Sequence, residues 1–131
     1  MKIIILDDSM TIRMIIESFL EDLGVDENSI FSFEHGHDAL EFIEANGADI
    51  VFTDINMPQM SGSEFVSKLL LNHKYLQNNL FAISGDESGE GFQAMRDSGV
   101  KKFLKKPLKI AHFNHFIRPI VSRLQDSSNS Y

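Results

Sequence analysis

Short runs of apolar residues alternate along the chain with longer segments in which apolar residues recur every three or four positions. A short apolar run between turn residues is typical of a buried strand, and the three-and-four spacing is typical of an amphipathic helix. The runs predict five strands: Ile3–Leu6, Ile30–Phe33, Asp49–Asp54, Leu80–Ser84 and Lys102–Lys105. The periodic segments predict five helices: Ile12–Leu23, Ala39–Ile43, Phe65–Leu70, Phe92–Asp97 and Ile110–Leu124.

Glycine and proline mark the ends of several of these helices. Gly24 and Gly99 directly follow periodic segments, as C-terminal glycines commonly do. Pro119 falls inside the last helical segment. Because proline lacks an N–H group and its ring clashes with the carbonyl four residues earlier, here that of His115, we expect a kink or a break at this point.

Strictly alternating strands and helices predict an α/β protein with a doubly wound parallel sheet and right-handed crossovers. The continuous apolar character of 49–53 suits a central strand that is covered on both faces. The units share no sequence period, which excludes a solenoid. We expect one domain over residues 1–124 and a frayed polar tail over residues 125–131.

Composition narrows the classes of function. The 131 residues suffice for one domain, and 43% hydrophobic with 24% charged residues is typical of a soluble globular protein. The net charge of −7 argues against nucleic-acid binding and against an anionic membrane surface. The absence of cysteine excludes disulfides, thiolate zinc sites and a thiol nucleophile, and it suits the cytoplasm.

Polar residues follow four of the predicted strands. Asp7 and Asp8 follow the first, Asp54 ends the third, Ser84 ends the fourth, and Lys106 follows the fifth. In open parallel sheets, ligands bind at the carboxyl ends of the strands. These five side chains are therefore candidates for one site.

Three carboxylates at one sheet edge need a counter-charge, because like charges so close cannot all ionise without a proton or a cation between them. Oxygen ligands favour a hard cation, so we expect Mg²⁺, with Mn²⁺ as the alternative. A lysine beside Asp54 would pair with an anion attached to that residue. Metal, lysine and a hydroxyl donor such as Ser84 are the groups that phosphoryl transfer requires.

Four short motifs, in order and spread over nearly the whole chain, resemble the signature of two-component response-regulator receivers of the single-domain, chemotaxis-regulator type. They are Leu6-Asp7-Asp8-Ser9, Asp54-Ile55-Asn56-Met57-Pro58 with Gly62 behind it, Ile83-Ser84-Gly85, and Phe103-Leu104-Lys105-Lys106-Pro107. The resemblance implies the flavodoxin-like sheet order 2-1-3-4-5. It also implies a phosphoacceptor switch without a separate enzymatic activity, whose donor is a histidine kinase or a histidine phosphotransfer protein.

The resemblance assigns a role to each residue of the site. Asp54 would form the acyl phosphate. Asp8, Asp54 and the backbone carbonyl of Asn56 would ligate Mg²⁺, and Asp7 would hold the ion largely through water. Lys106 would pair with the phosphate, and the peptide bond between Lys106 and Pro107 is expected to be cis.

The resemblance also implies a conformational switch. Ser84 would move toward the phosphoryl group and Phe103 would rotate into the vacated space, which alters the face made by helix four, strand five and helix five for a partner protein. Asn56 and Asp86 occupy the positions that tune phosphate hydrolysis, and their short polar side chains favour a short-lived phosphate.

Three departures from the family pattern affect these expectations. Phe103 lacks the hydroxyl of the commoner tyrosine. Gly85 stands where alanine is commoner, and Gly89 and Gly91 precede Phe92. Glycine populates many backbone conformations. We therefore expect a mobile entrance to helix four over residues 85–92, with weak protection from hydrogen exchange.

Taken singly, several of these residues also suit a purely structural role. Asp7 and Asp8 would suit a helix N-terminus, Ser84 an ordinary turn, and Phe103 a plain core position. Lys105 competes with Lys106, and only the adjacent Pro107 favours the latter. The remaining basic residues near 101–109 suit a solvated surface, and His112 with His115 suits an exposed pair, since no third ligand is evident.

Three other functions compete with the receiver. A haloacid-type phosphohydrolase would carry a second Asp at the position of Asn56. A flavodoxin-like FMN carrier would have a phosphate loop after the first strand, where Asp7 and Asp8 would repel it. A pseudo-receiver acting only as an interaction module would have lost part of the acidic set, which is complete here.

Overall fold

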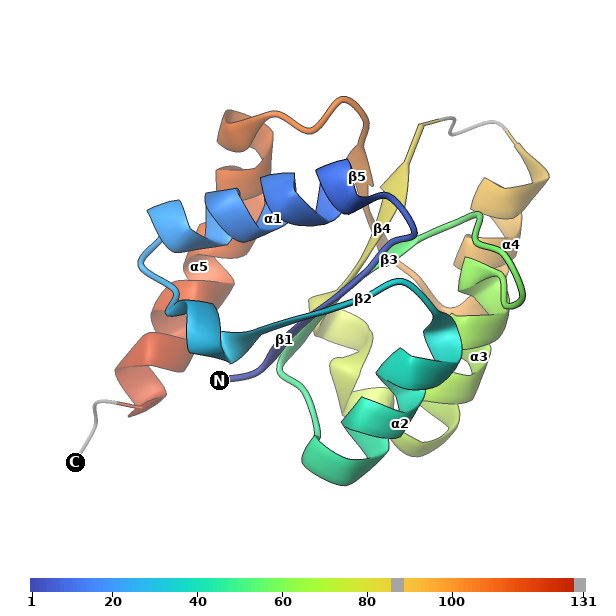
Figure 1. Cartoon of the computed structure of the whole chain (residues 1–131), viewed down its shortest axis with the longest axis horizontal. Coiled ribbons are helices and arrows are strands. Elements are labelled where there is room, and N and C mark those ends of the chain that lie inside the picture. Colours follow the sequence, from blue (N-terminus) through green and yellow to red (C-terminus); the bar gives the residue numbers. More distant parts are fainter. Residues whose placement is uncertain (86–88, 129–131) are drawn as a thin grey trace.

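The structure, a computed structural model, describes residues 1–85 and 89–128. Its core is a parallel sheet in the order β2-β1-β3-β4-β5, which confirms the predicted topology (Figure 1). The strands are β1 (Ile3–Leu6), β2 (Ile30–Phe33), β3 (Ile50–Asp54), β4 (Leu80–Ser84) and β5 (Lys102–Lys105).

Only β3 differs from the predicted strands, since it begins one residue later. Asp49 instead closes a reciprocal contact with Lys2. The N–H of Asp49 donates to the carbonyl of Lys2 over 2.8 Å, and the N–H of Lys2 donates to Oδ2 of Asp49 over 2.7 Å. Asp49 therefore binds the backbone of Lys2 with its side chain at the position where we expected it to be part of the strand.

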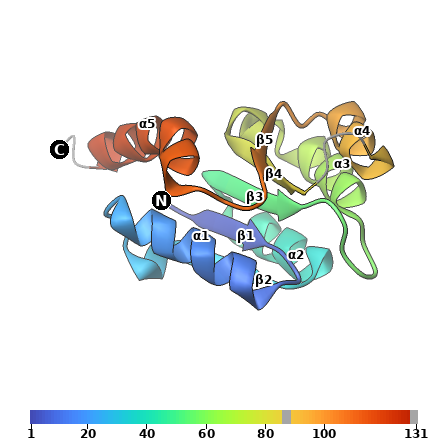
Figure 2. The same cartoon turned by 90° about the horizontal axis from the view of Figure 1, so that it is seen from above.

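The helices lie in two layers on either side of the sheet (Figures 1 and 2). α1 (Met10–Asp22) and α5 (Ile110–Ser128) cover one face. α2 (Gly36–Asn46), α3 (Gly62–Asn72) and α4 (Glu90–Ser98) cover the other. Two short 3₁₀ segments, Glu27–Ser29 and Lys74–Asn79, precede β2 and β4 and were not predicted.

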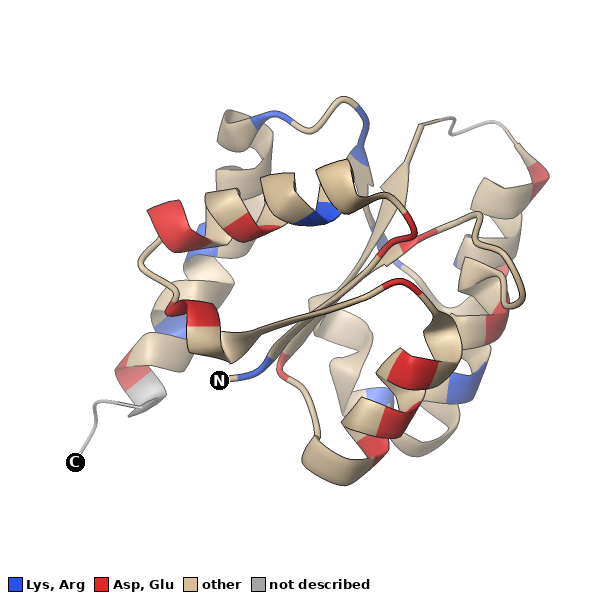
Figure 3. Cartoon of the chain, viewed as in Figure 1, with Lys and Arg blue, Asp and Glu red and all other residues tan. Residues whose placement is uncertain are grey.

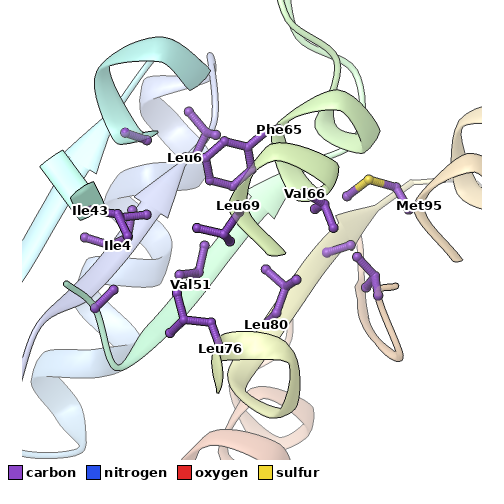
Figure 4. Packing of buried hydrophobic residues seen from close by; sticks show 14 of the residues in the cluster. Ile4, Leu6, Ile43, Val51, Phe65, Val66, Leu69, Leu76, Leu80 and Met95 are labelled. Carbon is purple, nitrogen blue, oxygen red and sulfur yellow. The ribbon is translucent and has the colours of Figure 1, made fainter. Parts of the chain in front are cut away.

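Each strand contributes side chains to the hydrophobic cores on both faces of the sheet, because successive side chains point in opposite directions. Ile3 and Ile5 of β1 pack in the cluster under α1 and α5. Ile4 and Leu6 pack in the opposite cluster, where Phe65 and neighbouring residues of α3 meet the sheet (Figure 4). The sheet is therefore fixed from both sides, and the carboxyl ends of its strands are held in register.

The last helix corrects two expectations. α5 continues through Pro119 and extends to Ser128, so the helix does not break at the proline and does not end at Leu124, whereas the alternative of a kink at Pro119 stays a prediction. Pro119 and His115 are both exposed. Water can therefore replace, on this exposed side of the helix, the hydrogen bond that the proline removes. Ile120 and Val121, directly after the proline, are buried against the sheet and hold the helix in place.

Candidate functional site

Three carboxylates converge where β1 and β3 end. The register pairs Leu6 with Thr53, so the residues that follow them, Asp7 and Asp54, leave the sheet side by side. One oxygen from each of Asp7, Asp8 and Asp54 lies within 4.8 Å of the other two. Figure 3 shows acidic residues gathered at these strand ends and basic residues near the end of β5. Parallel pairing thus brings together residues that are almost fifty positions apart.

Asp7 is the most deeply buried member of this cluster, with 0% of its surface exposed. The N–H of Ser9 donates to its Oδ1 over 2.8 Å, and Nη1 of Arg13 donates to its backbone carbonyl over 2.6 Å. Its Oδ2 is buried and has no hydrogen-bond partner among the described residues. Burial raises the pKa of Asp7 to about 6, assisted by the charge of Asp54 and opposed by the Ser9 hydrogen bond.

The unpartnered Oδ2 of Asp7 is a test of whether a cation fits the cluster. A buried carboxylate oxygen without a donor is costly, and a hard cation beside it would remove the cost. Asp8 is exposed and offers a second oxygen from the solvent side, while Asp54 offers a third. The donor set consists entirely of carboxylate oxygens, which suits Mg²⁺ with water completing its coordination.

Asp54 is held from two sides through one oxygen. The N–H of Ile55 donates to its Oδ1 over 2.7 Å, and Nζ of Lys106 lies 3.7 Å from the same atom. Burial raises the pKa of Asp54, and Lys106 and the Ile55 N–H oppose that rise. The carboxylate is thus oriented by neighbours that favour its ionised form.

The loop after Asp54 is fixed by the start of α3. The N–H of Gly62 donates to the carbonyl of Ile55 over 2.8 Å. A Cβ atom at Gly62 would lie 2.3 Å from the carbonyl oxygen of Asp54, closer than real contacts allow. Ser61 caps the helix by accepting from the N–H of Glu64. Glycine at position 62 is therefore required for the close approach that supports Asp54.

Ser84 and Lys106 are joined across the ends of β4 and β5. The N–H of Lys106 donates to the carbonyl of Ser84 over 2.8 Å, and Ser84 is 1% exposed. Lys106 forms the ion pair with Asp54, whereas the backbone of Lys105 pairs with Ser84 in the sheet and its side chain is exposed. The peptide bond between Lys106 and Pro107 is cis, as expected.

A cavity of about 510 Å³ opens beside Asp54. Asp54, Asn56, Ser84 and Lys106, which the sequence singled out, lie in its wall. Another part of the wall comes from the start of α4, which the sequence did not identify as part of the site. It consists of Gly89, Glu90, Gly91 and Phe92.

The start of α4 gives Gly91 a second role. A Cβ atom there would lie 2.7 Å from Cγ2 of Ile55 and 3.4 Å from Oδ1 of Asn56. Gly91 therefore permits a close approach to the loop after Asp54, besides any freedom that it gives the backbone. Asp86 and the middle of the expected mobile entrance, residues 86–88, lie outside the described residues.

Phe103 is half-buried on β5, beside α4. Its ring centroid lies 4.3 Å from that of Phe92, with the planes tilted by 40°. His112 and His115, in contrast, each pack edge-on against Phe116 at 5.1 Å. Neither belongs to a group of three potential metal ligands among the described residues, where only the aspartate cluster qualifies.

Comparisons with known proteins agree with this geometry. The family model described as the response regulator receiver domain matches residues 3–118. Chemotaxis protein CheY1 of Helicobacter pylori strain J99 is 31% identical over 108 residues, which cover 82% of this chain and 86% of that protein. The structure of chemotaxis response regulator CheY4 of Vibrio cholerae superposes with a TM-score of 0.77 at 25% identity, covering 91% of this chain and 97% of that one.

A longer relative has the same segment in another context. The cyclic di-GMP phosphodiesterase response regulator RpfG of Xanthomonas campestris is 35% identical over 111 residues, which cover 83% of this chain. The chain spans only 29% of the length of that relative. No helix within the described residues combines the length and apolar character that a membrane span needs.

Proposed function

The chain belongs to the response regulator receiver domain family, and we propose on this basis that it is a signalling switch that takes a phosphoryl group on Asp54. Receiver domains of two-component systems are signalling domains, and this one resembles the CheY proteins. The observation that carries the proposal is the position of Asp54, paired with Lys106 and clustered with Asp7 and Asp8.

The proposed reaction moves a phosphoryl group from a phosphohistidine of the donor to a carboxylate oxygen of Asp54. The bond between phosphorus and the histidine nitrogen breaks as the bond to the Asp54 oxygen forms, and the imidazole leaves with the electron pair. The Ile55 N–H and Lys106 orient Asp54 through Oδ1. Lys106 then pairs with the oxygens of the transferred group, where negative charge is spread in the transition state.

We propose that Asp8, Asp54 and the carbonyl of Asn56 hold Mg²⁺, or Mn²⁺ in its place. Asp7 would act largely through water. When bound, the ion neutralises charge on the phosphoryl oxygens and in the carboxylate cluster. The buried Oδ2 of Asp7 supports this assignment, because it has no partner within the described part of the chain.

The proposed output is a change in the face formed by α4, β5 and α5. Ser84 lies in the cavity wall beside Asp54, where its hydroxyl would donate to the phosphoryl group. Phe103 packs at the junction of β5 and α4, where a rotation of its ring would alter the surface. Phosphorylation would select the rearranged state from a pre-existing equilibrium. Asn56 and Asp86 would set the rate of hydrolysis.

We further propose a receiver domain over residues 1–124 in the cytoplasm. Its partners would be a histidine kinase or histidine phosphotransfer protein and a downstream protein, and neither nucleic acid nor membrane. Beyond its own phosphorylation and dephosphorylation, the domain would catalyse no reaction. We do not assign to this chain the phosphodiesterase activity named for the Xanthomonas relative. The match covers 29% of that protein, so the other 71% (100 − 29) lies outside it.

Beryllofluoride with Mg²⁺ tests the proposal, because it mimics a phosphoryl group on a carboxylate. We expect the amide resonances of β5 and α4 to shift in the unaltered protein and to remain unchanged in Asp54→Asn. Lys106→Ala is the matched control. It should still bind Mg²⁺ with at most a few-fold change in affinity, because it retains all three carboxylates, while the shifts in β5 are lost. If Asp54→Asn shows the same resonance shifts as the unaltered protein, the proposal is wrong.

A further inference from the structure

Phe92 separates Phe103 from the site that Phe103 is proposed to sense. Among the described residues, the wall of the cavity beside Asp54 includes Phe92 but not Phe103. The rings of Phe92 and Phe103 contact each other, with centroids 4.3 Å apart. Phe92 therefore touches both the cavity and the half-buried aromatic residue of β5.

The backbone before Phe92 is also coupled to the loop that follows Asp54. Gly91 approaches Ile55 and Asn56 so closely that a single added carbon would lie 2.7 Å from the Ile55 side chain. Ile55 is itself 7% exposed and donates its N–H to Asp54. Because closely packed groups transmit small displacements, a shift of this loop must move Gly91 and, with it, the adjacent Phe92.

We infer that Phe92 is a positioning residue that transmits the state of Asp54 to Phe103, an inference that rests on the proposed function. The contacts form a continuous path from Asp54 through Ile55 and Gly91 to Phe92 and then to Phe103. This path runs through α4, beside the proposed route through Ser84. With no hydroxyl on Phe103, ring packing against Phe92 replaces a polar contact as the constraint on its orientation.

The test compares Phe92→Leu with a matched control, Phe42→Leu. Phe31 and Phe42 form a similar pair of half-buried rings, 4.5 Å apart and tilted by 36°, at the β2 end of the same core. Phe92→Leu removes one tilted ring contact, whereas Phe42→Leu also removes the contact of Phe42 with Phe33 at 5.5 Å, so the control disturbs the core at least as much. Only Phe92→Leu interrupts the path from Asp54 to β5.

Beryllofluoride and Mg²⁺ are titrated while resonances of Ile55 and of Phe103 are followed by NMR. Ile55 reports occupancy at Asp54, and Phe103 reports the distant response. In Phe92→Leu we expect the Ile55 shift to persist while the Phe103 shift falls by about twofold or more. In Phe42→Leu both shifts should match those of the unaltered protein. A merely structural role for Phe92 would change both resonances in proportion.

A Phe103 shift of full size in Phe92→Leu would overturn the inference, as would a Phe103 ring that does not respond in the unaltered protein while Ile55 does. Absence of an Ile55 response in the unaltered protein would instead contradict the proposed function. If Phe92→Leu does not fold, Phe92→Met keeps more of the side-chain volume and gives the same comparison.

Discussion

Asp7 and Asp54 show how burial and charge compete within a few ångströms. Both carboxyl groups have raised pKa values, and burial is the largest cause for each. Lys106 opposes the rise in both cases, but one ammonium cannot balance three carboxylates. The site therefore carries an unfavourable charge, which a divalent ion would relieve.

This imbalance predicts how stability depends on pH in the absence of metal. In the folded protein the pKa of Asp7 is raised to about 6, whereas the ordinary value for an aspartate is 3.8. Between these values the folded state binds more protons than the unfolded state, so the free energy of unfolding falls as pH rises. Asp7→Asn removes this titration.

We expect the stability of Asp7→Asn relative to the unaltered protein to increase from pH 4 to pH 7. At 1.36 kcal/mol per pKa unit, the 2.2-unit rise from 3.8 to about 6 corresponds to at most roughly 3 kcal/mol. Urea unfolding of the metal-free proteins measures the difference. A difference that is constant over this range would show that Asp7 titrates normally.

At the scale of elements, two glycines at helix starts fix the loop that carries Asp54. Gly62 lies against backbone oxygens of Asp54 and Ile55, which have no room to move, whereas Gly91 lies against the side chain of Ile55. An added carbon at Gly85, in contrast, would meet no atom of the described residues within 4 Å, its chain neighbours aside. These positions predict different tolerances to the same substitution.

Gly62→Ala should destabilise the protein by about 1–3 kcal/mol, the usual cost of overpacking, because its Cβ would lie 2.3 Å from a backbone oxygen. Gly85→Ala should be neutral or stabilise by up to about 1 kcal/mol, through the lower entropy of the unfolded chain. Thermal or denaturant unfolding of both variants measures the contrast. Equal effects of the two substitutions would exclude the close approach at Gly62.

The elements that the sequence predicts well are those whose signal is local. Apolar runs mark four strands to the residue. The 3₁₀ segments Glu27–Ser29 and Lys74–Asn79 have no such signal, because their residues are mostly polar and follow no helical period. Pro119 is the opposite case, because its strong local signal for a break is overridden by the burial of Ile120 and Val121.

The residues of the candidate site also differ in whether a local signal in the sequence reveals them. Strand-end residues such as Asp7, Asp54 and Lys106 could be found because parallel pairing brings all strand ends to one edge. The contributions of Arg13 and Phe92 depend on how α1 and α4 pack against that edge. No spacing in the sequence encodes that packing, so these two residues emerge only from the structure.

At the scale of the whole molecule, the fold separates a rigid site from the surface that it would control. The sheet is packed on both faces and holds Asp7, Asp54 and Ser84 buried at the carboxyl ends of its strands. The first turn of α4 lies in the wall of the cavity beside Asp54, and the ring of Phe92 in that turn contacts Phe103 of β5. In the proposed path, a change of charge at Asp54 therefore reaches β5 through Ile55 and the first turn of α4.

The most direct test of the central claim is the intact mass of the protein after incubation with Mg²⁺ and a small phosphodonor such as acetyl phosphate. We expect the mass to increase by one phosphoryl group, which peptide mapping locates on Asp54. The increase should not occur when the metal is chelated before the reaction, nor in Asp54→Asn. A phosphoryl group carried equally by Asp54→Asn, or located on any other residue, would contradict the account.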